Sequence, residues 1–220
     1  MKRLAIELSS CQGSLALYEG TQCLEDIDWI DDRFNSQRFF KELGEMIQRH
    51  ELQIEDLHSL IAGRGPGNFT GLRTSMAALQ GLALPHGIEL LAISSGYALA
   101  WQVLSGENTP RVTVSGDARR NTIWTGTFTQ DNGQLRVEKD WHLVSASDFE
   151  ASLPEDAIHV SPEWERIAHQ ISRKQHWITQ NRYPKASFLV DLIHQTNNSG
   201  INEPFEPIYM HPPVEPRPVS

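Results

Sequence analysis

The chain has 220 residues, of which 39% are hydrophobic and 21% charged, a composition typical of a globular protein with a sizeable core. Its net charge of −9 argues against direct nucleic-acid binding by this chain, because phosphate recognition needs a basic face. Glu7 ends the first apolar run early, and no later run is long enough to cross a membrane. We therefore expect no signal peptide and no membrane contact, and predict a cytoplasmic protein.

Three antiparallel strands are predicted at the start of the chain. Residues 4–8, 14–20 and 21–30 alternate in the manner of strands and are separated by turns. A helix capped by Asn35 or Ser36 follows. Its apolar residues recur at helical spacing and are interpreted as core: Phe39, Phe40, Leu43, Met46 and Ile47.

Two strand–helix units come next. Residues 57–63 predict a strand that leads into a glycine-rich loop, and the helix after this loop ends at Pro85. Residues 87–93 predict another strand, and residues 95–104 another helix. Three meander strands followed by helix-linked strands indicate an α/β fold with a mixed sheet covered by helices, as in ribonuclease-H-like lobes.

A second lobe is predicted to begin at the turn-rich sequence SGENTP. The division gives an N-terminal ribonuclease-H-like lobe, residues 1–105, and a smaller C-terminal lobe with a proline-rich tail, residues 106–220. Residues 203–220 are expected to form one edge strand and then a disordered tail. The other elements expected in this lobe are strands at 111–116, 122–130, 134–144, 157–160 and 176–179, and weaker helices at 147–152, 162–171 and 185–195.

The stretch GRGPGNFTGLR resembles a phosphate-binding loop, because a glycine-rich turn before a helix exposes backbone N–H groups to an anion. The P-loop pattern fails, since Leu72 and Arg73 follow Gly71 where Lys and Ser or Thr are required. The dinucleotide fingerprint fails as well, because Gly65, Gly67 and Gly71 are spaced one residue too far. A strand-to-helix turn without a ligand remains an open alternative.

Other catalytic patterns are weak. None of the nine histidines lies three or four residues from another histidine or from a cysteine, and no G-x-S-x-G elbow occurs. We therefore predict no catalytic residue and no metal. Glu7, Ser9 and Ser10 end the first strand where actin-like ATPases hold metal and phosphate, so they are kept as a vestigial phosphate hairpin.

The helix over residues 71–84 is apolar on nearly every side. Such a helix must be covered nearly all round, and its small residues allow a second helix to approach closely. Contact with a partner and a wholly internal position are both compatible with the pattern. The candidate partner-binding residues are Gly71, Leu72, Ser75, Met76, Ala78, Leu79, Leu82 and Ala83.

Four stretches resemble the TsaB (YeaZ) family in collinear order: LAIELSSCQGSLAL, GRGPGNFTGLR followed by AALQGLA, GDARRNTIWTG and PIYMHPPV. The resemblance implies an actin-like (ASKHA) two-lobed fold and a non-catalytic subunit. Such a subunit binds a TsaD-like paralogue, which carries the metal and forms N6-threonylcarbamoyladenosine beside the anticodon of tRNA, and a TsaE-like ATPase joins them. The resemblance also implies that tRNA is met only through the complex and that the isolated chain pairs with itself. No cofactor is predicted for the chain, and ATP or ADP at the joint interface is left as an open alternative.

Departures from the family pattern leave alternatives open. Family members commonly open with AIDTS, whereas this chain has Glu7, Leu8 and Ser9. Asn35 and Asn68 stand where His and Ser are usual, so a conventional nucleotide site is in doubt. The alternative function is a free-standing actin-like ATPase or small-metabolite kinase, with Asp117 as its second acid. A peptidase has no nucleophile or metal motif to support it.

Overall fold

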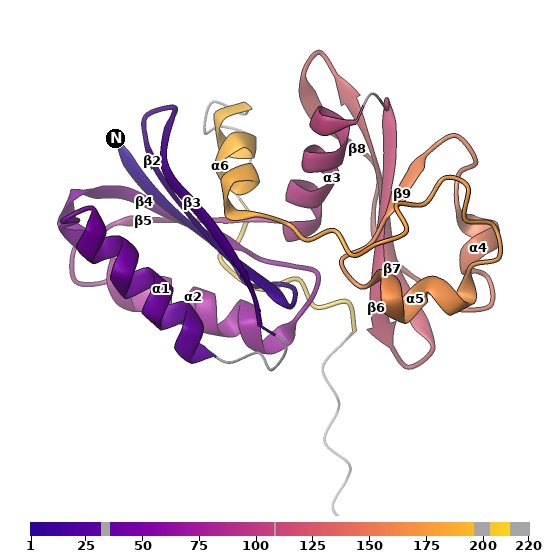
Figure 1. Cartoon of the computed structure of the whole chain (residues 1–220), viewed down its shortest axis with the longest axis horizontal. Helices are drawn as coiled ribbons and strands as arrows, with labels where there is room; N and C mark the ends of the chain where they lie inside the picture. Colours follow the sequence, from indigo (N-terminus) through magenta and orange to yellow (C-terminus); the bar gives the residue numbers. More distant parts are fainter. Residues whose placement is uncertain (32–35, 108, 196–202, 212–220) are drawn as a thin grey trace, which may run out of the picture.

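The computed structural model describes residues 1–31, 36–107, 109–195 and 203–211, and shows two β-sheets standing side by side with helices around and between them (Figure 1). The first sheet has the strand order β3-β2-β1-β4-β5. Its first three strands form an antiparallel meander, and β1, β4 and β5 run parallel. The bounds are β1 Lys2–Glu7, β2 Gln12–Glu19, β3 Gln22–Ile30, β4 Leu57–Gly63 and β5 Glu89–Ile93.

Helices α1 (Ser36–Arg49) and α2 (Phe69–Ala83) cover one face of the first sheet. The Asn68 side chain caps α2 by accepting the Thr70 N–H at 3.2 Å, which satisfies one of the free donors at the helix start. The core beneath the two helices joins β1 and β2 to α1 and α2. This confirms the interpretation of the α1 stripe as core, with the exception of Phe40, which is 52% exposed.

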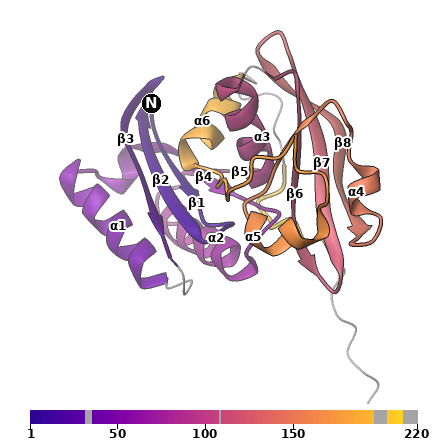
Figure 2. The same cartoon turned by 45° about the vertical axis from the view of Figure 1, so that its right-hand side comes forward.

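Helices α3 (Ser95–Gly106) and α6 (Ala186–Gln195) lie between the two sheets (Figure 2). Both α6 and Ala98 of α3 pack on the second face of the first sheet, whereas Leu99 of α3 belongs to the core of the second sheet. Because β1 is covered on both faces, its three central residues, Leu4, Ala5 and Ile6, are all apolar and fully buried.

The second sheet has the order β8-β7-β6-β9 and repeats the plan of the first, an antiparallel meander joined to a parallel strand. Two short helices, α4 and α5, cover the face that turns away from α3. The bounds are β6 Arg111–Arg119, β7 Thr122–Asp131, β8 Gln134–Ser145, β9 Ile158–Val160, α4 Phe149–Ser152 and α5 Trp164–Ile167, with 3-10 turns η1 Ile54–Asp56 and η2 Ala168–Gln170.

Most of the predicted elements are present, and two are not. The strand expected at 176–179 is reduced to a bridge between Trp177 and His159. The expected edge strand near the C-terminus does not form in 203–211, where Pro204 and Pro207 supply no N–H for a ladder. Asn35 and the tail from residue 212 onward lie outside the described residues.

The predicted division after residue 105 falls at the end of α3, between the two sheets. However, α6 returns to the first sheet although it belongs to the second half of the sequence. Helix α6 is therefore structurally part of the first lobe. Across the described residues, no helix combines the length and apolarity that a membrane span requires.

Candidate functional site

Helix α2 turns most of the predicted partner-binding residues toward its own core. Met76 is 5% exposed and belongs to the cluster beneath α1 and α2. Gly71 is half-buried, and a Cβ there would overlap the carbonyl oxygen of Leu8, so this glycine is required by a contact within the chain. The buried members of the predicted set are Leu72, Ser75, Met76, Leu79 and Ala83, while Gly71, Ala78 and Leu82 are half-buried. The buried members of the set therefore pack within the chain, and the more accessible side of α2 is the opposite one.

The accessible side of α1 and α2 carries small and apolar residues among polar ones such as Lys41, Arg73 and Gln80. Leu84, just after α2, is 86% exposed, and Phe40 on α1 is 52% exposed. A Cβ added at Gly44 or Gly81 would meet no atom within 4 Å, so both glycines open onto solvent. Small residues let a second helix approach closely, and exposed large apolar side chains gain from being covered. We define the outer face as Phe40, Gly44, Ala77, Gly81 and Leu84.

The glycine-rich loop is filled by the chain's own first hairpin. The N–H of Asn68 donates to the carbonyl oxygen of Ser9 at 2.6 Å. A Cβ at Gly67 would overlap that same oxygen, and Gly65 has a φ of 92°, which glycine adopts without strain. The glycines of this loop allow its backbone to approach the backbone of the first hairpin. The geometry therefore supports a packed strand-to-helix turn over a phosphate-binding loop.

The three residues of the predicted phosphate hairpin have different surroundings. Glu7 is fully buried and its Oε1 accepts the Ser9 N–H at 2.6 Å, so the acid closes the β1–β2 turn from inside. Burial raises the pKa of this carboxyl above its ordinary value, and hydrogen bonds from Ser9 and Ser95 act in the opposite direction. Ser10 is bonded to the backbone of Gln12, as donor and as acceptor. The Glu7 side chain therefore lies behind the hairpin, in the protein interior, and not on its solvent-facing side.

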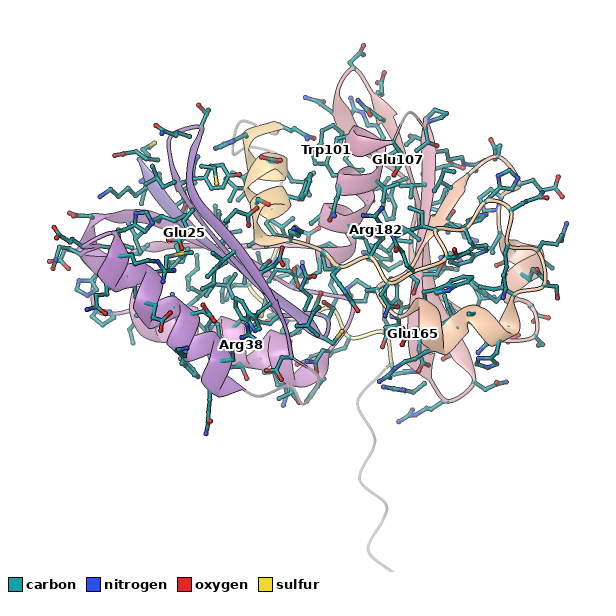
Figure 3. The ribbon with its side chains drawn as sticks, in the orientation of Figure 1. Glu25, Arg38, Trp101, Glu107, Glu165 and Arg182 are labelled. Carbon is teal, nitrogen blue, oxygen red and sulfur yellow. The ribbon has the colours of Figure 1, made fainter. Side chains whose placement is uncertain are left out.

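A cleft of about 850 Å³ lies between the two sheets, and Ser9 and Ser10 line it from the first lobe. From the second lobe it is lined by Asp117, Arg119 and Glu165, the last of which is labelled between the two sheets in Figure 3. The β1–β2 and β6–β7 turns thus face the same space, one from each sheet. Glu7 does not line it.

The acid Asp117 on the wall of the cleft is paired with neighbouring arginines. Asp117 Oδ2 accepts Arg119 Nη1 at 2.7 Å and lies 3.8 Å from Arg166 Nη1. The Asp117 N–H donates to Glu163 Oε2 at 3.0 Å, and burial raises the pKa of Glu163. Asp117, the candidate second acid of an ATPase, is therefore engaged by two arginines. No three His, Cys, Asp or Glu side chains of the described segments lie close enough to hold a metal ion.

The two-lobed arrangement defines the class: this is an α/β protein of actin-like (ASKHA) fold. Residues 32–182 match the family described as TsaD: tRNA N6-adenosine threonylcarbamoyltransferase. The protein named tRNA threonylcarbamoyladenosine biosynthesis protein TsaB from Haemophilus influenzae is 30% identical over 71% of this chain and 66% of its own length. Its namesake from Escherichia coli is 25% identical over 74% of this chain and 69% of its own.

Two solved structures from Pseudomonas aeruginosa share the fold over nearly the whole chain. The one described as YeaZ has a TM-score of 0.78 at 23% identity and covers 94% of this chain and 99% of its own. The other, an uncharacterized protein with similarity to peptidase YeaZ, has a TM-score of 0.81 at 21% identity, with 96% and 99% covered. The chain belongs to the family that matches residues 32–182 and, within it, to the TsaB (YeaZ) proteins.

Proposed function

We propose that this chain is the non-catalytic subunit that binds a TsaD-like threonylcarbamoyltransferase and supports it in forming N6-threonylcarbamoyladenosine next to the anticodon of tRNAs. Family membership supports a role in threonylcarbamoyladenosine biosynthesis, because the TsaB relatives are named as proteins of that pathway. The observation that supports a binding role is the outer face of α1 and α2, where open glycines lie beside exposed apolar side chains.

The proposal extends to the rest of the assembly. A TsaE-like ATPase joins the pair, and tRNA meets this chain only within the complex, in keeping with the net charge of −9. The chain itself has no cofactor, and ATP or ADP would bind at the joint interface. Without its partner the chain pairs with itself through the same face, as a homodimer in the cytoplasm.

The engagement of the cleft residues supports an inactive subunit over an independent ATPase. Glu7 is behind its hairpin and Asp117 is held by arginines, so neither acid is free to hold metal and phosphate in this arrangement. We expect the purified chain to hydrolyse ATP no faster than a buffer blank. Metal-dependent turnover that disappears in Asp117→Asn would favour the ATPase instead.

Gly81→Arg and Gly44→Arg test the docking proposal. Each adds a long charged side chain where a Cβ meets nothing, so the fold should be kept while close approach of a partner helix is blocked. Gly106→Arg is the matched control, since it also opens onto solvent but at the end of α3, away from α1 and α2.

The measurement is co-purification with the TsaD-like partner, followed by mass spectrometry of tRNA nucleosides from cells that depend on each variant. We expect Gly81→Arg to lose both the partner and the modified nucleoside, and Gly106→Arg to keep both. Equal partner recovery for the two variants would contradict docking on the outer face. Normal modification in cells lacking the chain, with no substitute subunit, would contradict the function itself.

A further inference from the structure

Residues 203–211, defined here as the strap, run between the two lobes in an extended path (Figure 1). The strap includes most of the motif PIYMHPPV, which the docking proposal does not use. It has no strand partner, yet it is held by backbone and side-chain bonds to both sheets' flanking turns. These contacts to both lobes suggest a structural role for the strap.

The first lobe holds the strap through Arg64 in the glycine-rich loop. Arg64 Nη1 lies 2.6 Å from Glu203 Oε2, and Arg64 Nε donates to the carbonyl oxygen of Glu206 at 2.8 Å. The Ile208 N–H returns a bond of 2.7 Å to the Arg64 carbonyl oxygen. The Arg64 side chain is 12% exposed and that of Glu203 is 30% exposed, so this charge-assisted pair is partly shielded from solvent.

The start of α2 adds a second contact. Arg73 Nε donates to the Tyr209 hydroxyl at 3.0 Å, and the Phe69 and Tyr209 rings lie 5.3 Å apart. The Arg73 guanidinium sits 3.9 Å from the centre of the Phe69 ring. The strap thus engages an arginine that lines the interlobe cleft.

The second lobe holds the other end of the strap. His211 Nε2 donates to the carbonyl oxygen of Ala118 at 2.8 Å, beside the β6–β7 turn. Met210 packs against the core that joins α3 to the second sheet. Ile208, Tyr209, Met210 and His211 all line the cleft.

We infer that the strap is an interlobe latch: it ties the glycine-rich loop and the start of α2 to the β6–β7 turn, and so sets the opening of the cleft. This inference is independent of the proposed partner, because every contact in it lies within the chain. If the inference is right, removing the Arg64 contacts in the first lobe must also increase the mobility of the β6–β7 turn in the second lobe.

The test is hydrogen–deuterium exchange, measured without any partner on the full-length parent chain, on the single variants Arg64→Glu and Glu203→Arg, and on the double variant that carries both substitutions. Each single reversal places like charges together, and we expect about tenfold faster exchange across residues 115–123 as well as beside Arg64. The double variant restores opposite charges, although not the Arg64 Nε bond to the Glu206 carbonyl oxygen, and should exchange more slowly than either single variant. Arg136→Glu, in the exposed pair with Asp131, is the charge-matched control and should change neither segment.

His211→Ala approaches the latch from its other end and leaves the Arg64–Glu203 pair intact. Faster exchange over residues 64–72 in this variant supports the latch. Exchange that rises only beside the substituted residue, in both arms, would show two separate attachments and overturn the inference. Exchange in the double variant that is as fast as in both single variants would overturn it as well.

Discussion

Met76→Ala measures whether the inner side of α2 is core or interface. Met76 is 5% exposed in the chain alone and packs in the cluster shared by β1, β2, α1 and α2. Truncating a buried Met to Ala removes its transfer free energy and leaves a cavity, at a cost of about 2–5 kcal/mol in the free energy of unfolding. For a chain of this size, that lowers the Tm by about 4–20 °C.

The assay is thermal and urea unfolding of the isolated chain at a concentration where it is monomeric. Ala77→Glu is the matched control, because Ala77 is the next residue and is exposed, and we expect it to stay within about 0.5 kcal/mol of the parent. A side chain that packed only in an interface would leave the monomer's stability unchanged when truncated. An unfolding curve for Met76→Ala that overlays the parent's would therefore refute the assignment of this side of α2 to the core.

Three further predictions follow from buried groups. Burial raises the pKa of Glu7, so its neutral form stabilises the fold at acid pH, and this contribution is lost as the pH rises above the ordinary value of 4.5. The free energy of unfolding of Glu7→Gln should therefore fall less than the parent's as the pH rises through this range. An unchanged pH profile would contradict this prediction. Burial lowers the pKa of His159 to about 4, so stability falls as the pH drops from 6.5 toward 4, and urea titrations of His159→Gln should show that dependence reduced. Gly63→Ala places a methyl group on the Glu7 carboxylate and should cost about 1–3 kcal/mol, whereas Gly81→Ala, in open space inside a helix, should gain about 0.5–1 kcal/mol; equal melting temperatures would contradict both.

The fold could be predicted from sequence because its signals are local. Strand alternation in residues 4–30, the stripe of α1 and the proline after α2 each report the conformation of the segment that carries them. The prediction for the C-terminal segment was wrong. Its apolar residues resemble an edge strand, but its prolines lack the N–H donors that pairing in a sheet needs. Its bonds to Arg64 cross well over a hundred residues of sequence, and no local pattern reports them.

The site was harder to predict because the exposed side of α2 mixes polar residues, such as Arg73 and Gln80, with the small residues Ala77 and Gly81. Met76 and Ala77 are neighbours in sequence, yet one lies in the core and the other faces solvent. A helix with polar residues on one side reveals its buried side, but here the contrast between the sides is too small to do so. The signal that was available is the position of Gly81 and Leu84, which lie opposite the inner stripe and become informative only once that stripe is placed.

The glycines show why composition alone does not separate structure from function in this segment. Gly63, Gly67 and Gly71 are glycines because Glu7, Ser9 and Leu8 occupy the space that a side chain would need. Gly44 and Gly81 have empty space instead, so packing within the chain gives no reason for the absence of a side chain there. In a helix interior each also costs stability relative to alanine. Under the docking proposal, close approach of a partner helix at the outer face is the reason for the glycines at positions 44 and 81, and the arginine substitutions at Gly44 and Gly81 test it.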